Sequence, residues 1–323
     1  MTMHALSELL SEGEPLARKS PGALAALARR LLRFATHLAT RLRGNAWLAT
    51  QTRDRAVGLG PLQRPACGRV MLVGAGPGDP ELLTLKALQA VRGADVILYD
   101  QLVSDEILAL APARAERIAV GKKGYGKACK QGEINELMVA FGAAGRRVVR
   151  LKAGDPLMFG RLEEEMAALD AAGIRFEVVP GISAAQGAAA RLKISLTRRR
   201  GARRFQAITG HADQGGLPDD FDWAGLADPK ATTAVYMPKA TIGDLCAELM
   251  RRGLSASHPV AAVFNATRPS EVTLAATLAT LPERIADAAS DAPCIVLVGE
   301  AVARLAPMRQ SMERPELAAA VRS

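Results

Sequence analysis

A glycine-rich loop at residues 74–79 is the first segment whose residue types could do chemistry. It reads GAGPGD and follows a short apolar run, so it should join a buried strand to a helix. A dinucleotide fingerprint of the form GxGxxG needs glycine at position 79, where this chain has Asp79. Pro77 has no N–H to donate to a phosphate, and the Asp79 carboxylate would repel one.

Three interpretations of this loop stay open from the residues alone. A nucleoside that lacks phosphate and carries a positive sulfonium is compatible with both Pro77 and Asp79. NAD or FAD is disfavoured by the same two residues. A tight turn that binds no ligand is the third interpretation.

Cysteine and histidine spacing gives no sign of a metal site or a disulfide framework. No two cysteines form a CxxC pair, and the histidines do not cluster with them. These residues are Cys67, Cys129, Cys246, Cys294, His4, His37, His211 and His258. We therefore expect ordinary thiols, no bound metal and a reducing cytoplasm.

The formal net charge of +9 is concentrated at the start of the chain. Residues 1–67 hold ten Lys or Arg and four Asp or Glu, a net of +6, which leaves +3 for the other 256 residues. The basic excess therefore says little about an active site in the main body. Neither a membrane-spanning apolar run nor a signal peptide is predicted.

Residues 1–67 are predicted to form a basic, partly helical extension and linker. Ser20 can cap a helix, Pro21 suits its first position, and Gly44 can end it. Apolar and basic residues within 20–44 lie mostly on different helical faces. Docking on the body or on a partner subunit, contact with a membrane surface or nucleic acid, and disorder all remain open for this segment.

From Gly68 onward the pattern alternates between strands and helices, which indicates two consecutive α/β domains. We expect domains at 68–197 and 198–305 and a tail at 306–323. One helix should begin at Asp79-Pro80 and end at Gly93. The expected strands are 69–76, 95–100, 117–120, 147–155, 176–181, 204–211, 232–237, 259–265 and 294–299. Ligands of such folds bind beyond the carboxyl ends of the strands.

Longer segments resemble the uroporphyrinogen-III C-methyltransferases of the tetrapyrrole methylase family. VGAGPGDPELLTLKALQAVRGADVILYDQLVS (73–104) is similar to the start of these enzymes. The same order continues with VGKKGY (120–125), QGEIN (131–135), RVVRLKAGDP (147–156), EVVPGISAA (177–185), ITGH (208–211) and VYM (235–237). The resemblance covers about residues 68–305 and does not extend to residues 1–67.

The resemblance implies a fold, a reaction and a set of site residues. It implies two α/β domains with S-adenosylmethionine in the cleft between them, in a homodimer. It implies two methyl transfers to uroporphyrinogen III, giving precorrin-2 for sirohaem or cobalamin synthesis. Asp100 matches the proposed proton acceptor and Lys122 the proposed proton donor. The implied cofactor contacts are Pro77, Ala153, Gly154, Asp155, Met158, Ser183, Ala184, Met237 and Ala266.

The implied chemistry suits these residue types, although each has a structural alternative. A sulfonium makes its methyl group electrophilic, so the main task of the protein is to position the substrate carbon in line with that methyl group. A carboxylate such as Asp100 can stabilise the positive charge that forms on the substrate or take a proton from it. Asp100 could equally be a turn or helix cap. The substrate's carboxylates call for cations, for which the candidates are Lys122, Lys123, Arg150, Lys152 and Arg161.

Two further features near the motifs are ambiguous. The arginine-rich run 198–204 could face substrate, nucleic acid or solvent, but no aromatic residues interleave it, so no nucleic-acid partner is expected. His211 could make a structural hydrogen bond or take part in catalysis.

Several positions depart from the family pattern. Gln101 replaces a common arginine, Ala153 and Ala266 replace frequent glycines, Leu162 stands where glycine is common, and Arg198 occupies the place of a histidine. These departures keep two alternatives open: methylation of another tetrapyrrole, and a catalytically weak ligand-binding relative. One versus two methyl transfers and sirohaem versus cobalamin also stay undecided.

Overall fold

The computed structural model describes residues 68–121, 129–212, 215–288 and 291–309. The chain forms two compact units, and each is described by itself. The first unit runs to Gly74 and includes Thr84–Lys152 and Gly160–Pro180, while the second contains Ala75–Leu83, Ala153–Phe159 and the chain from Gly181 onward. The predicted extension 1–67, the Lys122 region and the tail beyond 309 lie outside the described residues.

The first unit contains a five-stranded parallel sheet in the order β3-β2-β4-β1-β5. The strands are β1 (Arg69–Gly74), β2 (Val96–Tyr99), β3 (Glu116–Ala119), β4 (Arg147–Lys152) and β5 (Phe176–Val179). Each of these five strands coincides at least in part with a segment that was predicted to be a strand. Because parallel strands are buried on both faces, short Val- and Leu-rich runs predicted them well.

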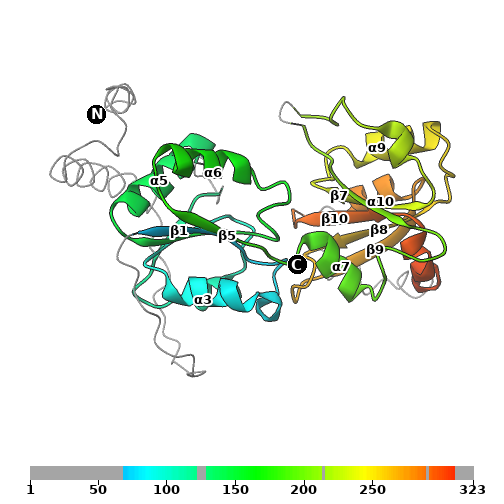
Figure 1. Cartoon of the computed structure of the whole chain (residues 1–323). Coiled ribbons are helices and arrows are strands. Elements are labelled where there is room, and N and C mark those ends of the chain that lie inside the picture. Colours follow the sequence, from blue (N-terminus) through cyan, green and yellow to red (C-terminus); the bar gives the residue numbers. More distant parts are fainter. Residues whose placement is uncertain (1–67, 122–128, 213–214, 289–290, 310–323) are drawn as a thin grey trace. The chain divides into compact units, whose positions relative to one another are not determined.

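Helices cover both faces of this sheet (Figure 1). α5 (Gln131–Ala143) and α6 (Leu162–Ala171) lie on one face, and α3 (Leu85–Gly93) lies on the other. A short helix, α4 (Asp105–Ala109), follows β2. The core under α5 and α6 includes Phe141 and Leu169, both almost fully buried. This three-layer arrangement confirms the α/β expectation for the first half.

The second unit contains a mixed five-stranded sheet in the order β6-β7-β10-β8-β9. The strands are β6 (Arg204–Thr209), β7 (Ala231–Tyr236), β8 (Pro259–Phe264), β9 (Val272–Thr277) and β10 (Cys294–Val298). Only β6 and β7 pair in parallel, and the other three pairings are antiparallel. β9 was not among the predicted strands, because threonines interrupt its apolar residues and it has no continuous apolar run.

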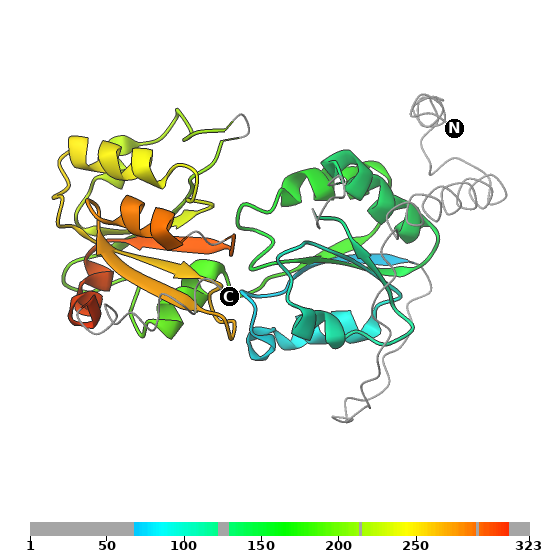
Figure 2. The same ribbon diagram turned by 180° about the vertical axis from the view of Figure 1, so that it is seen from behind.

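Helices also lie on both faces of the second sheet. α9 (Ile242–Arg251) and α10 (Leu281–Ala288) share one face, and α7 (Ala184–Arg191) and the 3-10 segment η3 (Glu300–Arg309) share the other (Figure 2). The remaining helix, α8 (Trp223–Leu226), is short. In the part of the chain that the structure describes, no helix has both the length and the apolar character needed to cross a bilayer.

The helix expected from Asp79 to Gly93 is broken near its start. The Asp79 side chain accepts a hydrogen bond from the Glu81 N–H at 2.8 Å, but it caps only the 3-10 turn η2 (Pro80–Leu82). Leu83 is extended, and Thr84 then caps α3 by accepting from the Ala87 N–H at 3.1 Å. The predicted start was therefore wrong, because a second capping residue begins the helix five positions later.

Candidate functional site

Two of the predicted ligand loops are joined through their backbones in the second unit. The N–H of Gly76 donates to the carbonyl of Gly154 at 3.1 Å, and the N–H of Gly154 donates to the carbonyl of Gly76 at 2.7 Å. Both residues have φ of 70°, which glycine adopts without steric cost. The strand-to-helix loop after β1 and the loop after β4 therefore form one continuous backbone surface.

Pro77 packs against helix α7 and the loop that follows β8. A Cβ placed on Gly187 of α7 would lie 2.7 Å from Pro77 Cγ and 3.0 Å from Thr267 Cγ2. The N–H of Asp79 donates to Thr267 Oγ1 at 3.1 Å. Three segments far apart in the sequence thus meet at Pro77, and Ala266 lies next to this contact.

Ser183 and Ala184 form the start of helix α7. The Ser183 hydroxyl accepts from the Gln186 N–H at 3.3 Å, and the Gln186 side chain accepts from the Ser183 N–H at 3.1 Å, which makes a capping box. A Cβ on Gly154 would lie 3.9 Å from the nitrogen of Ala184. Gly154 and the start of α7 are therefore neighbours, as the predicted contact set requires.

Backbone strain gathers in the same loops. Of the six non-glycine residues with positive φ among those described, Met237 is itself a predicted contact, and Phe159, Asn265 and Thr267 lie next to one in the sequence. Such conformations cost free energy and are concentrated at functional sites. Only Asn265 could have been expected from its residue type, since asparagine tolerates the left-handed region.

Exposed apolar side chains lie on two of these loops. Leu157 is 61% exposed, Phe159 is 42% exposed and Met237 is 52% exposed. The ring of Phe159 lies 5.0 Å from that of Tyr236, centroid to centroid. Met158 belongs to the same turn, in which its N–H donates to the Asp155 carbonyl and the Asp155 carboxylate accepts from the Leu157 N–H. Exposed apolar side chains on these loops suit a nucleoside without phosphate better than they suit a phosphate group.

All nine predicted cofactor residues lie in the second unit, but Asp100 lies in the first. Asp100 directly follows β2, and its N–H donates to the Leu151 carbonyl at 3.2 Å. Its side chain is 31% exposed and accepts a hydrogen bond of 2.6 Å from the Arg150 guanidinium. A carboxylate at the carboxyl end of a parallel strand is where this fold class places ligand-binding groups.

Arg150 and Lys152 do not present their charges to solvent, contrary to the expectation that they could pair with substrate carboxylates. Arg150 is 2% exposed and Lys152 is 4% exposed, and both contact Glu165 Oε1, at 3.0 Å and 2.8 Å. They are two residues apart on β4, so their side chains share the face covered by α5 and α6.

These buried charges influence one another. Burial lowers the pKa of Lys152, as does the neighbouring Arg150. For Arg150 burial acts in the same direction, but the carboxylates of Asp100 and Glu165 outweigh it and raise its pKa. Sequence reasoning missed Glu165, although two cations inside an otherwise apolar strand are a signal that a buried carboxylate must face them.

The other predicted cations lie elsewhere. Lys122 and Lys123 fall outside the described residues. Arg161 is exposed and donates to the Glu164 carboxylate at 2.6 Å. In the run 198–204, Arg198, Arg203 and Arg204 donate to backbone carbonyls, and Arg204 also pairs with Asp228. All five arginines of the run are exposed.

The departures from the family pattern are accommodated locally. Ala153 is not among the residues with positive φ, so its Cβ causes no backbone strain. Leu162 is 6% exposed and packs in the core under α5 and α6, and Ala266 is 7% exposed. Gln101 is exposed beside Gly121. His211 is also exposed, and its backbone N–H donates to Thr209 Oγ1 at 3.3 Å.

The described thiols and acids do not form a metal site. No group of three or more His, Cys, Asp or Glu residues within the described ranges is arranged to hold an ion. Burial raises the pKa of both Cys246 and Cys294 to about 12, so these thiols stay protonated at neutral pH.

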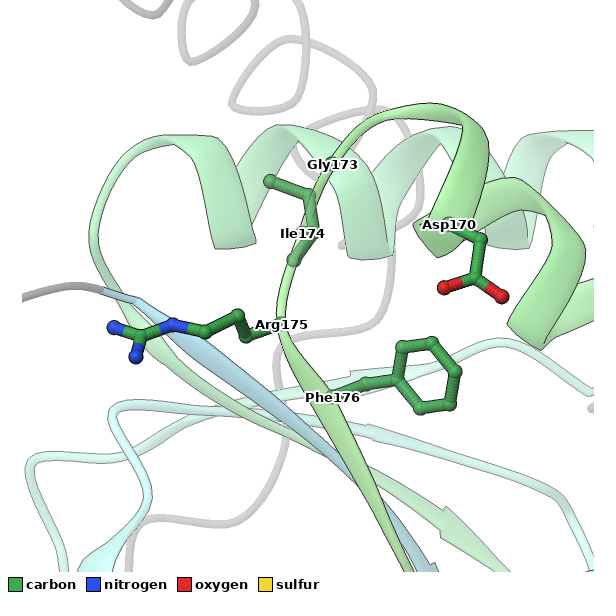
Figure 3. A pocket seen from close by; sticks show the side chains of 5 residues that line it. All are labelled: Asp170, Gly173, Ile174, Arg175 and Phe176. Carbon is green, nitrogen blue, oxygen red and sulfur yellow. The ribbon is translucent and has the colours of Figure 1, made fainter. Parts of the chain in front are cut away.

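A shallow pocket of about 390 Å³ lies at the amino end of β5, whereas Asp100 follows the carboxyl end of β2 in the same sheet. Figure 3 shows its lining residues, with the side chains of Asp170 and Phe176 on one side of the strand and Arg175 on the other. Ligands of parallel α/β sheets bind at the carboxyl ends of strands, so this pocket is not the expected site.

Comparison with known proteins gives one consistent result. Residues 69–282 match the profile of the family described as Tetrapyrrole (Corrin/Porphyrin) Methylases. A siroheme synthase from Methylococcus capsulatus is 49% identical over 240 residues, which is 74% of this chain and 50% of that protein. A uroporphyrinogen-III C-methyltransferase from Paracoccus denitrificans is 46% identical over 251 residues, which is 77% of this chain and 87% of that protein.

A solved structure agrees with these sequence matches. The uroporphyrin-III C-methyl transferase of Thermus thermophilus, in complex with S-adenyl homocysteine, aligns with a TM-score of 0.63 and 39% identity. The alignment covers 73% of this chain and 99% of that one. The chain spans about half the length of the siroheme synthase that it matches and most of the length of the methyltransferases.

Proposed function

The chain belongs to the tetrapyrrole methylase family, and we propose that it transfers methyl groups from S-adenosylmethionine to carbon atoms of uroporphyrinogen III. Two transfers would give precorrin-2, the precursor of sirohaem and cobalamin. The observation that carries this proposal is the single backbone surface formed by the predicted cofactor loops of the second unit. Relatives named for the same reaction, including one bound to S-adenyl homocysteine, support it.

The residues of the second unit fit such a donor chemically. Gly76 and Gly154 pair with each other and present a backbone surface without side chains, Pro77 offers a ring surface without an N–H, and Leu157 and Met237 offer exposed apolar side chains. None of these groups would neutralise a phosphate, whereas an adenosine with a sulfonium needs apolar contact and backbone hydrogen bonds. When bound, S-adenosylmethionine supplies a methyl group made electrophilic by its sulfonium.

Asp100 is proposed as the proton acceptor of the first unit. Attack by a pyrrole carbon on the methyl group leaves positive charge on the ring system, and a carboxylate can stabilise that charge or remove a proton. Asp100 is the one member of the described charge cluster that is substantially exposed, while Arg150, Lys152 and Glu165 are buried behind it. Lys122 is proposed as the proton donor on the resemblance alone.

A homodimer and a cytoplasmic location are proposed from the same resemblance. The cysteines within the described residues are free thiols, which accords with a reducing compartment. Light scattering of the purified chain tests the dimer, and a mass equal to one chain would contradict it.

Anaerobic incubation with S-adenosylmethionine and uroporphyrinogen III tests the proposed reaction. The expected result is a product with the absorption of a methylated tetrapyrrole, formed together with S-adenosylhomocysteine in a fixed ratio. Absence of both products from a folded protein that binds S-adenosylhomocysteine would contradict the proposed substrate. Methylation of a different tetrapyrrole in parallel reactions would support the alternative to which Gln101 points.

A further inference from the structure

A carboxylate that the sequence motifs do not include lies at the centre of the buried charges of the first unit. Glu165 on α6 is fully buried. Its Oε1 accepts from Lys152 Nζ at 2.8 Å, Arg150 Nε at 3.0 Å and Gln131 Nε2 at 3.3 Å. All three donors meet this one oxygen, and Glu165 Oε2 is buried without a hydrogen-bond partner among the described residues. The two preceding acids on the helix, Glu163 and Glu164, are exposed.

Arg150 connects Glu165 to Asp100. Its Nε donates to Glu165, its NH2 donates to Asp100 Oδ1 at 2.6 Å, and its NH1 donates to the carbonyls of Leu98 and Leu151. Because the guanidinium is planar and rigid, an acceptor that fixes Nε also fixes the direction of NH2. The acceptor at Glu165 therefore determines where Arg150 meets the carboxylate of Asp100.

The cluster is also balanced in charge. Two cations, Arg150 and Lys152, face two anions, Asp100 and Glu165, and only Asp100 is substantially exposed. Loss of the charge on Glu165 would leave Asp100 as the single anion beside two buried cations. Arg150 would then have Asp100 as its only carboxylate acceptor among the described residues.

We infer that Glu165 is a positioning residue for Asp100, acting through Arg150 to fix the orientation of the proton acceptor. This inference rests on the proposed function, in which Asp100 takes a proton. Glu165 itself does not touch the substrate. Its effect must therefore appear as a change in the properties of Asp100, which a purely structural role would leave unchanged.

The first test uses Glu165→Gln, which keeps the side-chain length and removes the charge. We expect the carboxyl signal of Asp100 to change position, because an amide holds the Arg150 guanidinium less strongly than a carboxylate does. Carbon-13 NMR of the aspartate carboxyls in the full chain at fixed pH measures this change, and Asp100→Asn identifies the signal. The kcat for methyl transfer should fall about tenfold, with KM for S-adenosylmethionine unchanged.

The matched control is Glu163→Gln, two residues earlier on the same helix and exposed. It should leave both the Asp100 carboxyl signal and kcat as in the wild type. A folded Glu165→Gln chain with an unchanged Asp100 signal would overturn the inference. The NMR measurement does not depend on turnover, so it decides the role of Glu165 even if the chain fails to methylate uroporphyrinogen III.

A second pair of variants avoids an unbalanced buried charge, which could prevent Glu165→Gln from folding. Lys152→Met combined with Glu165→Gln removes one cation and one anion but keeps an oxygen acceptor for Arg150 Nε. Lys152→Met combined with Glu165→Leu removes the acceptor as well. We expect kcat within about threefold of wild type for the first and about tenfold lower for the second, because a hydrogen bond to a charged group is lost. Equal kcat values for the two double variants would contradict the positioning role.

Discussion

At the level of single residues, the proposed methyl transfer depends most on Asp100. Asp100→Asn keeps the shape of the side chain and can still contact Arg150, but it cannot accept a proton. We expect kcat for methyl transfer to fall by about a hundredfold, which is typical for loss of a general base. Binding of S-adenosylhomocysteine, measured by calorimetry, should stay unchanged, because the predicted cofactor residues lie in the other unit. Turnover equal to that of the wild type would exclude Asp100 as the proton acceptor.

Gln101 is the departure from the family pattern that bears most directly on the substrate. It is exposed and follows Asp100 in the sequence, where the family resemblance implies arginine. If uroporphyrinogen III is the substrate, Gln101→Arg should lower KM for it about threefold through an added charge contact with a carboxylate. Steady-state kinetics with the tetrapyrrole as the varied substrate measures this effect. A higher KM would favour a different tetrapyrrole.

At the element scale, the contact between α7 and the glycine-rich loop can be tested with one methyl group. A Cβ on Gly187 would lie 2.7 Å from Pro77 Cγ, so Gly187→Ala must displace the loop. We expect about tenfold weaker binding of S-adenosylhomocysteine, because overpacking of this size costs one or more kcal/mol. Isothermal titration calorimetry measures the affinity.

Gly243→Ala is the matched control for that experiment. Gly243 lies in helix α9 of the same unit, and a Cβ there would meet no atom within 4 Å. The substitution should leave the affinity unchanged and stabilise the helix slightly. If the two variants bind S-adenosylhomocysteine equally well, Pro77 does not determine the affinity.

The amino ends of β2 and β4 are joined by an ion pair that affects stability. Asp95 accepts from the Arg147 guanidinium at 2.6 and 3.0 Å and from its backbone N–H at 3.0 Å. The Arg147 hydrogen bonds lower the pKa of Asp95 to about 2. Because the folded pKa lies below the unfolded one, this stabilisation is complete above about pH 4 and is lost as pH falls towards 2.

Asp95→Asn should therefore lower the free energy of unfolding by about 1 kcal/mol near neutral pH, after allowance for partial exposure. The difference from wild type should shrink as pH falls from 4 towards 2. Urea denaturation at several pH values measures it. A difference that does not vary over that range would show that the ion pair is not its source.

At the scale of the whole molecule, the sequence predicted the alternation of strands and helices, but it predicted packing less well. Parallel strands such as β1 and β4 are continuous apolar runs, so they are easy to recognise. β9 was not predicted because threonines interrupt its apolar residues. The start of α3 was misplaced because Asp79 and Thr84 are both good helix-capping residues. The role of Glu165 depends on which face of α6 meets β4, and spacing alone cannot give that.

The family match begins at residue 69, and all nine predicted cofactor residues lie within the matched range. A chain that starts at residue 68 should therefore bind S-adenosylhomocysteine within about twofold of the full chain. Removal of residues 1–67 also lowers the net charge from +9 to +3. Calorimetry compares the two chains, and loss of binding in the shorter one would assign residues 1–67 a part in the cofactor site.

The proposed methyl transfer is tested by mass spectrometry of the tetrapyrrole after anaerobic incubation with S-adenosylmethionine and the full chain, followed by oxidation. We expect uroporphyrinogen III to gain the mass of two methyl groups, and Asp100→Asn to reduce this gain greatly. If the wild-type chain folds and binds S-adenosylhomocysteine but the tetrapyrrole gains no methyl group, uroporphyrinogen III is not its substrate.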